Sequence, residues 1–192
     1  KFHNGKTMTS ADVLASYERF AKVGVQRGFF EQIAEMSAPD ADTFVLKLRK
    51  KVPVAMEELS QFGNPVVIIP AEQKDREGGK SDPIGTGPYQ YVEWVADSHV
   101  KLKRFDGYVP DQRFKGTNGF GGNKIAYLDE LDFRYVKEPV ARVAGMETGQ
   151  FHISEDVPTK AAKRLKDNKA IALYPVQRWW IHGAWVNHTF AP

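Results

Sequence analysis

The residues best suited to binding a ligand lie close together in one segment of the sequence. The segment reads Arg178-Trp179-Trp180-Ile181-His182-Gly183-Ala184-Trp185 and holds three of the chain's four tryptophans. On a β-strand, Arg178, Trp180 and His182 would share one side, because side chains alternate along a strand. A guanidinium, an indole and an imidazole on one surface can stack on and hydrogen-bond a polar organic ligand in a cleft. An equally good interpretation is that other elements cover both sides of this strand.

A second candidate is an acid/base cluster around His152. The imidazole lies close in sequence to the carboxylates of Glu155 and Asp156, and such groups can transfer protons. A strand end with solvated carboxylates explains the same residues better. The five histidines lack H-x-x-x-H spacing and the chain has no cysteine, so no metal-binding pattern is present. The sequence therefore predicts no catalytic residue, metal site or cofactor.

Phosphate and nucleic-acid binding are not supported by the remaining motifs. Gly85-Thr86-Gly87 lacks the third glycine of the dinucleotide-binding pattern, since residue 90 is Gln. Two basic runs, Lys47 to Lys51 and Lys160 to Lys169, are interpreted as solvated faces of a strand and a helix. Nucleic-acid binding would need basic and aromatic residues that converge on one surface. We therefore expect no nucleic-acid partner.

Composition excludes a membrane-spanning protein for this sequence. The 192 residues are 42% hydrophobic and 27% charged, as in a globular chain with a substantial core. The strongest apolar run, Val66 to Ile69, is far shorter than the ~20 residues of a membrane-spanning helix. The net charge of +3 is too small to indicate a partner. The first residues contain no signal peptide and look like the middle of a longer sequence.

The elements that must position these residues follow from local patterns. Thr9 can cap a helix expected from about Ser10 to Lys22, whose apolar stripe would be buried. Residues 33–49 predict a hairpin, and Pro53 can start a short helix. The run from Val66 to Ile69 reads as a buried strand.

A polar stretch from Ala71 to Asp82 is the best candidate for an internal boundary, because it has no apolar periodicity. It would separate a small subdomain, residues 1–82, from residues 83–192. The second part opens with two strands, at Tyr89–Trp94 and His99–Phe105.

Residues 127–153 predict a βαβ-like unit. A strand at 127–136 precedes a helix that starts at Pro139 and ends near Gly149, and Phe151-His152-Ile153 returns as a strand. A helix and a strand are expected next, at about Thr159–Asp167 and Ala170–Val176. The fold class is therefore α/β (mixed α+β), with mixed sheets flanked by helices.

Several motifs occur in the order of a known family. The segment Phe2 to Val13, FHNGKTMTSADV, resembles the F-x-[DN]-G-x-x-[LM]-[ST]-A-x-D-V pattern of the family 5 extracellular solute-binding proteins of ABC importers, the dipeptide and oligopeptide type. Further segments resemble the family in the same order: PIGTGPY at 83–89, VKL at 100–102, RFDGY at 104–108, YLDELDFRY at 127–135, GMETGQFHISED at 145–156, and VNHT at 186–189 with Pro192. The resemblance spans essentially the whole chain.

Three kinds of position depart from the family pattern. Val109 stands where Trp is common, Gln150 and His152 replace the usual acidic residues, and the glycine loop from Gly116 to Asn123 resembles only a subset of members. None of these positions bears on a reaction, because the family binds and delivers solutes without chemistry.

The resemblance implies a two-lobed protein of the periplasmic-binding-protein type II, with its ligand between the lobes. This chain would be a fragment, under half of a typical member, that supplies the small subdomain and part of the first main lobe. When the ligand contacts of the family are carried over to this sequence position by position, they fall on Arg178, Trp180 and His182. Trp179 is a further candidate. The residues that hold peptide termini in several members would lie on the other lobe.

The function implied is that of the substrate-binding component of an ABC importer. It would close about a hinge around a small solute and dock on membrane permease subunits. A peptide is the leading solute, and an opine, an oligosaccharide or a nickel chelate are the others that relatives bind. The location implied is the periplasm, or the cell exterior as a membrane-anchored lipoprotein.

Two alternatives come from other classes. A hydrolase could be organised around His152 or His182 with nearby carboxylates. A sensory or chaperone module could use the same domain, and it would differ in the sequence beyond Pro192.

Overall fold

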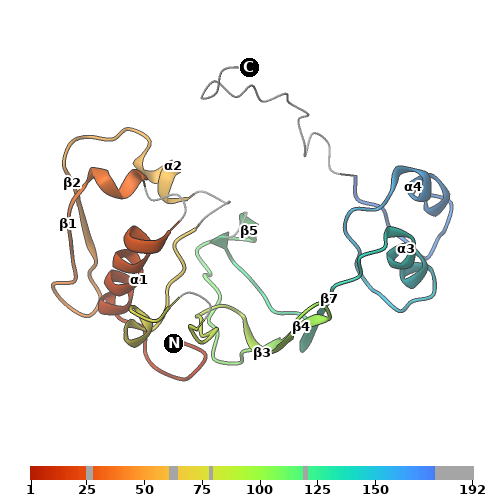
Figure 1. Ribbon diagram of the computed structural model, residues 1–192, viewed down its shortest axis with the longest axis horizontal. Helices are drawn as coiled ribbons and strands as arrows, with labels where there is room; N and C mark the ends of the chain where they lie inside the picture. The colour runs from red at the N-terminus through yellow and green to blue at the C-terminus, as the bar shows by residue number, and fades with distance from the viewer. Residues whose placement is uncertain (25–27, 61–64, 78–79, 119–120, 176–192) are drawn as a thin grey trace, which may run out of the picture. The chain divides into compact units, whose positions relative to one another are not determined.

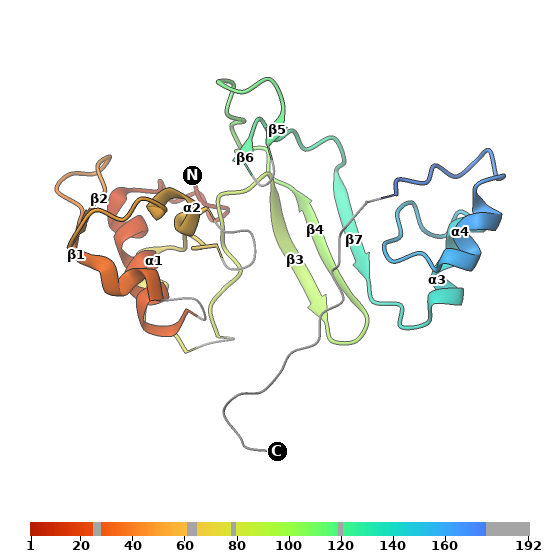
Figure 2. The same cartoon turned by 90° about the horizontal axis from the view of Figure 1, so that it is seen from above.

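The computed structural model describes residues 1–24, 28–60, 65–77, 80–118 and 121–175 (Figures 1 and 2). Contacts divide the chain into two compact units, 1–134 and 135–192. Helices and sheets both contribute, in agreement with the mixed α/β class. Among the described residues, no helix is both long and apolar enough to span a membrane.

The first helix, α1 (Ser10–Val23), confirms the predicted helix and its start after Thr9. The predicted apolar stripe is only half-buried, and its members Tyr17 and Phe20 join an aromatic cluster. The Tyr17 ring lies 4.8 Å from the Phe44 ring, and the Phe20 ring lies 5.2 Å from the Phe30 ring, measured between centroids. Phe30 belongs to the 3₁₀ helix η1 (Gly28–Gln32).

The predicted hairpin is also present. Strands β1 (Ile33–Ser37) and β2 (Val45–Leu48) pair antiparallel, with Ile33 opposite Leu48 and Ser37 opposite Val45. A short helix, α2 (Ala55–Leu59), follows two residues after Pro53.

The prediction of a strand at Val66 to Ile69 is wrong. These residues are in no strand ladder, and Val67 is 65% exposed. The run leads through Pro70 into the 3₁₀ helix η2 (Ala71–Gln73), which lies against α1 (Figure 1). The amides of Ile69 and Ala71 bond to side chains of α1 and not to a neighbouring strand.

A three-stranded antiparallel sheet forms the other part of the first unit. Its order is β3-β4-β7, from strands β3 (Tyr89–Val95), β4 (His99–Arg104) and β7 (Glu130–Arg134) (Figure 2). Trp94, Val100 and Phe133 lie in one row across it. The sheet thus has an apolar face, on which Trp94 is 66% exposed.

The other face of the same sheet is polar. Glu93 accepts from Lys101 Nζ at 2.6 Å and contacts His99 Nε2 at 3.2 Å. The loop after β4 contains a small ladder of two-residue strands, β5 (Thr117–Asn118) and β6 (Gly121–Gly122).

The second unit contains α3 (Pro139–Glu147) and α4 (Thr159–Leu165), close to both predictions. Gly149 has φ +74°, the left-handed conformation expected of the residue that ends α3.

The βαβ-like unit is not completed in the described residues. Phe151-His152-Ile153 forms no strand, because Phe151 N donates to Gly145 O at 3.0 Å and its ring lies against Gly145. This contact closes the end of α3 and turns the chain back onto the helix. Strand β7, at the start of the predicted unit, pairs antiparallel with β4.

The strand predicted at Ala170–Val176 is likewise not formed over residues 170–175. Ala170 N donates to the Asn168 side chain at 3.0 Å, and Ile171 N donates to Asn168 O at 3.1 Å. The next residues have no partner strand in the described part of the second unit. The subdomain division at residue 82 stays a prediction, since it concerns the arrangement of a larger lobe.

Candidate functional site

The four residues predicted to contact a ligand are not among those that the structure describes. Arg178, Trp179, Trp180 and His182 all fall in the range 176–192. Their assignment therefore stays a prediction. The described residues instead show how the segments with family-like motifs are held together.

His152 and its neighbouring carboxylates form no acid/base cluster in the described structure. His152, Glu155 and Asp156 are all exposed, and no hydrogen bond or ion pair between described residues joins the imidazole to either carboxylate. Asp156 has φ +52°, which turns the chain at this point. Groups of three or more His, Cys, Asp or Glu that could hold a metal are absent from the described residues.

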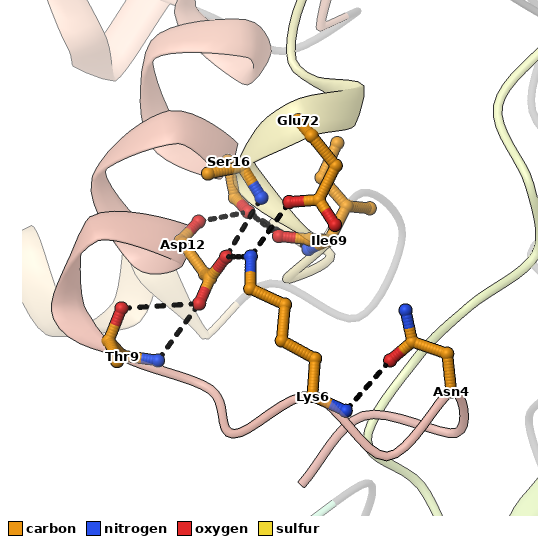
Figure 3. A network of polar contacts seen from close by, with 8 residues as sticks. Asn4, Lys6, Thr9, Asp12, Ser16, Ile69 and Glu72 are labelled. Atoms are coloured by element: carbon orange, nitrogen blue, oxygen red, sulfur yellow. Dashed lines mark hydrogen bonds and ion pairs between the residues drawn. The ribbon is translucent and has the colours of Figure 1, made fainter.

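The most connected group of charged side chains lies at the start of α1 (Figure 3). A turn with Gly5 at φ +85° brings Lys6 back over the helix. Lys6 Nζ lies 2.7 Å from Asp12 Oδ1 and 2.7 Å from Glu72 Oε2. Asp12 is on α1 and Glu72 is on η2, so one lysine joins three segments of the chain.

Asp12 is the buried member of this group, with 1% of its surface exposed. Its Oδ1 accepts from Lys6 Nζ and from the amide of Ala71 at 2.8 Å. Its Oδ2 accepts from the amide of Thr9 at 2.9 Å and from the Thr9 hydroxyl at 3.3 Å. Both carboxylate oxygens are therefore fully used by the protein itself.

Ser16, one turn further along α1, makes the second connection to the same segment. Its hydroxyl donates to Asp12 O at 2.7 Å and accepts from the amide of Ile69 at 2.9 Å (Figure 3). The amides of Ile69 and Ala71 are thus both satisfied by α1 side chains. These bonds supply the acceptors that the two partly buried amides need in the absence of a neighbouring strand.

Opposing effects set the pKa of Asp12. Burial would raise it, but hydrogen bonds from Lys6 and from the Thr9 and Ala71 amides outweigh burial and hold the pKa of Asp12 below its ordinary value. Hydrogen bonding to Asp12 and then to Glu72 raises the pKa of Lys6. The pair is therefore ionised at neutral pH.

Acidification is expected to weaken this connection. A carboxylate with a lowered folded-state pKa stabilises the fold fully above its unfolded value, near 3.9, and loses that contribution as the pH falls through its folded pKa. Lys6 stays charged throughout this range. We expect the difference in unfolding free energy between the native protein and an Asp12→Asn variant to shrink between about pH 5 and pH 2. Denaturant titrations across this range measure it, and a difference independent of pH would contradict the role of the charge.

His3 links the first family-like motif to the second. Its Nδ1 accepts from the amide of Gly85 at 3.3 Å, its Nε2 lies 3.0 Å from Gly87 O, and its own amide donates to Gly85 O at 2.9 Å. These partners assign the neutral tautomer with the proton on Nε2. The ring also packs against that of Phe105 in an edge-type arrangement, with 5.0 Å between centroids. Segments 82 to 84 residues apart in sequence thus lie together.

The hydrogen bonds of Asp12, Ser16 and His3 can hold the backbone in position, but they leave few polar atoms free to bind a ligand. The atoms of Asp12 that could bind a cation are occupied by four protein donors. The sequence pattern predicted a helix cap at Thr9, but nothing in it indicated the hydrogen bond between Asp12 and the Ala71 amide. A polar pair at Asp12 and Ser16, four residues apart on a helix, was the signal that this side of α1 is buried and hydrogen-bonded.

Comparisons with known proteins agree on one family. The family model for bacterial extracellular solute-binding proteins, family 5 Middle, matches residues 1–192. A Brucella ovis protein named as an ABC transporter peptide-binding protein is 31% identical over 171 residues, covering 83% of this chain and 30% of the relative. The glutathione-binding protein GsiB of Pectobacterium atrosepticum is 26% identical over 179 residues, covering 90% of this chain and 32% of the relative.

A solved structure supports the fold. The protein AgaA of A. tumefaciens R10, in complex with agropinic acid, matches with a TM-score of 0.70 and 26% sequence identity. The match covers 88% of this chain and 33% of AgaA. The chain spans about a third of the length of the curated relatives it matches.

Proposed function

Because this chain belongs to family 5 of the bacterial extracellular solute-binding proteins, we propose that the whole protein is the substrate-binding component of an ABC importer. The observation that carries the proposal is the family match over every residue, together with a relative at 31% identity named for peptide binding. The motif order found in the sequence points to the same family.

A peptide is the proposed solute. Two relatives support it by name, one as a peptide-binding protein and one as a glutathione-binding protein. The structural match to a protein with agropinic acid shows that this fold also accommodates other small polar solutes. A cleft lined by aromatic groups and a few polar ones would suit a small polar solute of this kind.

Within this chain, we propose that Arg178, Trp180 and His182 contact the solute, with Trp179 as the reserve position. Their residue types support the assignment. Arg178 can pair with a carboxylate, Trp180 can stack on a planar or apolar group, and His182 can donate or accept a hydrogen bond. The remaining contacts would come from the part of the protein beyond this chain.

The described residues support this role indirectly. Lys6, Asp12 and Ser16 fix α1 to the segment that runs through Ile69 to Glu72. A binding protein that closes around its ligand needs rigid bodies on either side of its hinge. We propose that this network serves rigidity, and that the solute is bound and released without covalent chemistry. His152 is exposed and has no carboxylate partner among the described residues, so nothing there supports the hydrolase alternative at this histidine.

The proposed location follows from the family, whose members are extracellular solute-binding proteins. We propose that the protein works on the outer side of the cytoplasmic membrane, in the periplasm or anchored to the cell surface. Its partner there would be the permease that receives the solute.

Identification of the bound solute tests the function. The full-length protein, purified without denaturation, is expected to carry a small peptide that native mass spectrometry detects and that calorimetry then confirms by rebinding. The peptide should be recovered intact after prolonged incubation. Recovery of cleaved products would favour the hydrolase, and failure to bind any di- to nonapeptide in a library would contradict the peptide proposal.

A further inference from the structure

Exposed basic side chains gather on α4 and the turn that follows it. Residues 160–169 contain five basic residues and one acidic residue, Asp167. The basic ones are all exposed: Lys160, Lys163, Arg164, Lys166 and Lys169. These ten residues carry more net positive charge than the whole chain, whose net charge is +3. The rest of the chain is therefore close to neutral.

The helix fixes where most of these charges point, since all but Lys169 lie on α4 or at its C-terminal cap. Leu165, on the opposite side of α4, is only 2% exposed and anchors the helix in its unit. Lys160, Lys163 and Arg164 are three and four residues apart and so share the outward face. Lys166, the C-terminal cap of α4, also has helical backbone angles and follows Lys163 by three residues, so these two share a face. Lys169 is exposed in the turn that follows.

Only one of the five basic side chains forms an ion pair with another described residue of the chain. Arg164 makes a two-point ion pair with Glu147 of α3, with Nη1 2.8 Å from Oε1 and Nη2 3.1 Å from Oε2. The other four, all lysines, have no hydrogen bond or ion pair with any described side chain. We define Lys160, Lys163, Lys166 and Lys169 as the lysine face.

We propose that the lysine face docks on the anionic headgroup surface of a lipid bilayer. The inference rests on the proposed function, because a protein that delivers solute to a membrane permease must work at a bilayer surface. Phosphate-bearing headgroups present a diffuse negative potential that attracts clustered basic residues without fixed geometry. The lysine face complements such a potential in sign.

The residue types favour a lipid surface over a protein partner. Lysine is depleted in protein interfaces, where arginine and aromatic residues dominate. The one arginine of this region is already paired with Glu147, and the buried Leu165 leaves no large apolar side chain on the outward face. Flexible ammonium groups act as point charges, which suits a fluid array of headgroups.

The binding expected is weak and depends strongly on salt. Each basic residue near an anionic membrane contributes about a fivefold increase in affinity, and this attraction falls off within about 10 Å at 0.1 M salt. Such contact would raise the local concentration of the protein at the membrane while leaving it free to detach.

Vesicle sedimentation tests the proposal with the full-length protein prepared without a lipid anchor. We expect binding to vesicles of phosphatidylglycerol and phosphatidylcholine at low salt, and little binding to phosphatidylcholine alone. The variant K160Q/K163Q/K166Q/K169Q should bind at least about tenfold more weakly. Replacing the same four lysines by arginine should preserve binding, which separates charge from folding.

A charge-matched control removes four exposed lysines elsewhere. Lys50, Lys51, Lys103 and Lys115 are exposed and have no ion pair among the described residues. K50Q/K51Q/K103Q/K115Q should retain vesicle binding, because only the local cluster is proposed to matter. Equal loss in both glutamine variants would overturn the proposal, as would binding that appears only when permease is present in neutral vesicles. Solute affinity, measured separately by calorimetry, decides the proposed function independently of this result.

Discussion

Replacing Asp12 by alanine in the full-length protein is expected to speed hydrogen exchange at the Thr9 and Ala71 amides by about a hundredfold, or about 3 kcal/mol of local stability. The carboxylate accepts from both amides and from Lys6 Nζ, and it is nearly inaccessible to solvent. Its removal leaves two partly buried donors without an acceptor, and each such donor costs about 1–3 kcal/mol. Exchange measured amide by amide by NMR reports the local opening directly.

Glu72→Gln is the matched control for this experiment. Glu72 contacts the same lysine at the same distance as Asp12, but its side chain is 56% exposed. Exposed ion pairs contribute little to stability, so the control should exchange almost as slowly as the native protein. If Asp12→Ala also left both amides protected, the network would not hold the segment in place.

Replacing Trp180 by alanine in the full-length protein is expected to weaken solute binding by at least about tenfold, with little change in melting temperature. The reason is the proposed place of the indole in the cleft, where a large aromatic group stacks on the solute and excludes water. Calorimetry with the solute that co-purifies with the native protein measures the affinity. Thermal unfolding of the solute-free variant measures the stability.

Trp179→Ala gives the comparison that separates the two interpretations of this segment. On a strand, Trp179 and Trp180 point to opposite sides. Only one of the two substitutions should then reduce affinity, and the other should reduce stability, since loss of a buried tryptophan costs about 3–5 kcal/mol. If both variants melted much earlier and bound solute normally once folded, both sides of the strand would be core.

Elements with a complete local pattern were predictable from sequence. Helix α1 begins after Thr9 as expected, and α3 starts at Pro139 and ends with Gly149 in the left-handed conformation. Strands β3 and β4 were also predicted, because alternation and a short turn between them encode an antiparallel pair. In each case the residues that decide the structure are neighbours in sequence.

Elements that depend on distant partners were not predictable. The run from Val66 to Ile69 has the composition of a buried strand, but its amide at Ile69 bonds to Ser16, 53 residues away. That tertiary hydrogen bond overrides local preference. The strand predicted at Phe151 failed for a local reason, because its amide and ring close the end of α3 at Gly145, six residues back.

The candidate site, too, was predictable only in part. Composition alone identified the segment around Trp180 as unusual, and only the family resemblance turned it into a proposed ligand contact. The polar network at Asp12 was not predicted beyond the cap at Thr9, since nothing local indicates that Lys6 and the Ala71 amide bond to Asp12 or that Glu72 joins Lys6. The lysine face was interpreted as solvated, and only the structure shows that its four lysines have no ion pair among the described residues.

The ties made by His3 and Asp12 also bear on the order in which the chain folds. Asp12 bonds to the amide of Ala71 across 59 residues, and His3 contacts Gly87 across 84. Closing loops of this length costs chain entropy that local helices and hairpins avoid, so high contact order slows their formation. We expect α1 and the β1–β2 hairpin to form early, whereas the segment around His3 can be secured only after residues 85–87 are available. The beginning of this sequence would thus be among its last parts to reach its native contacts.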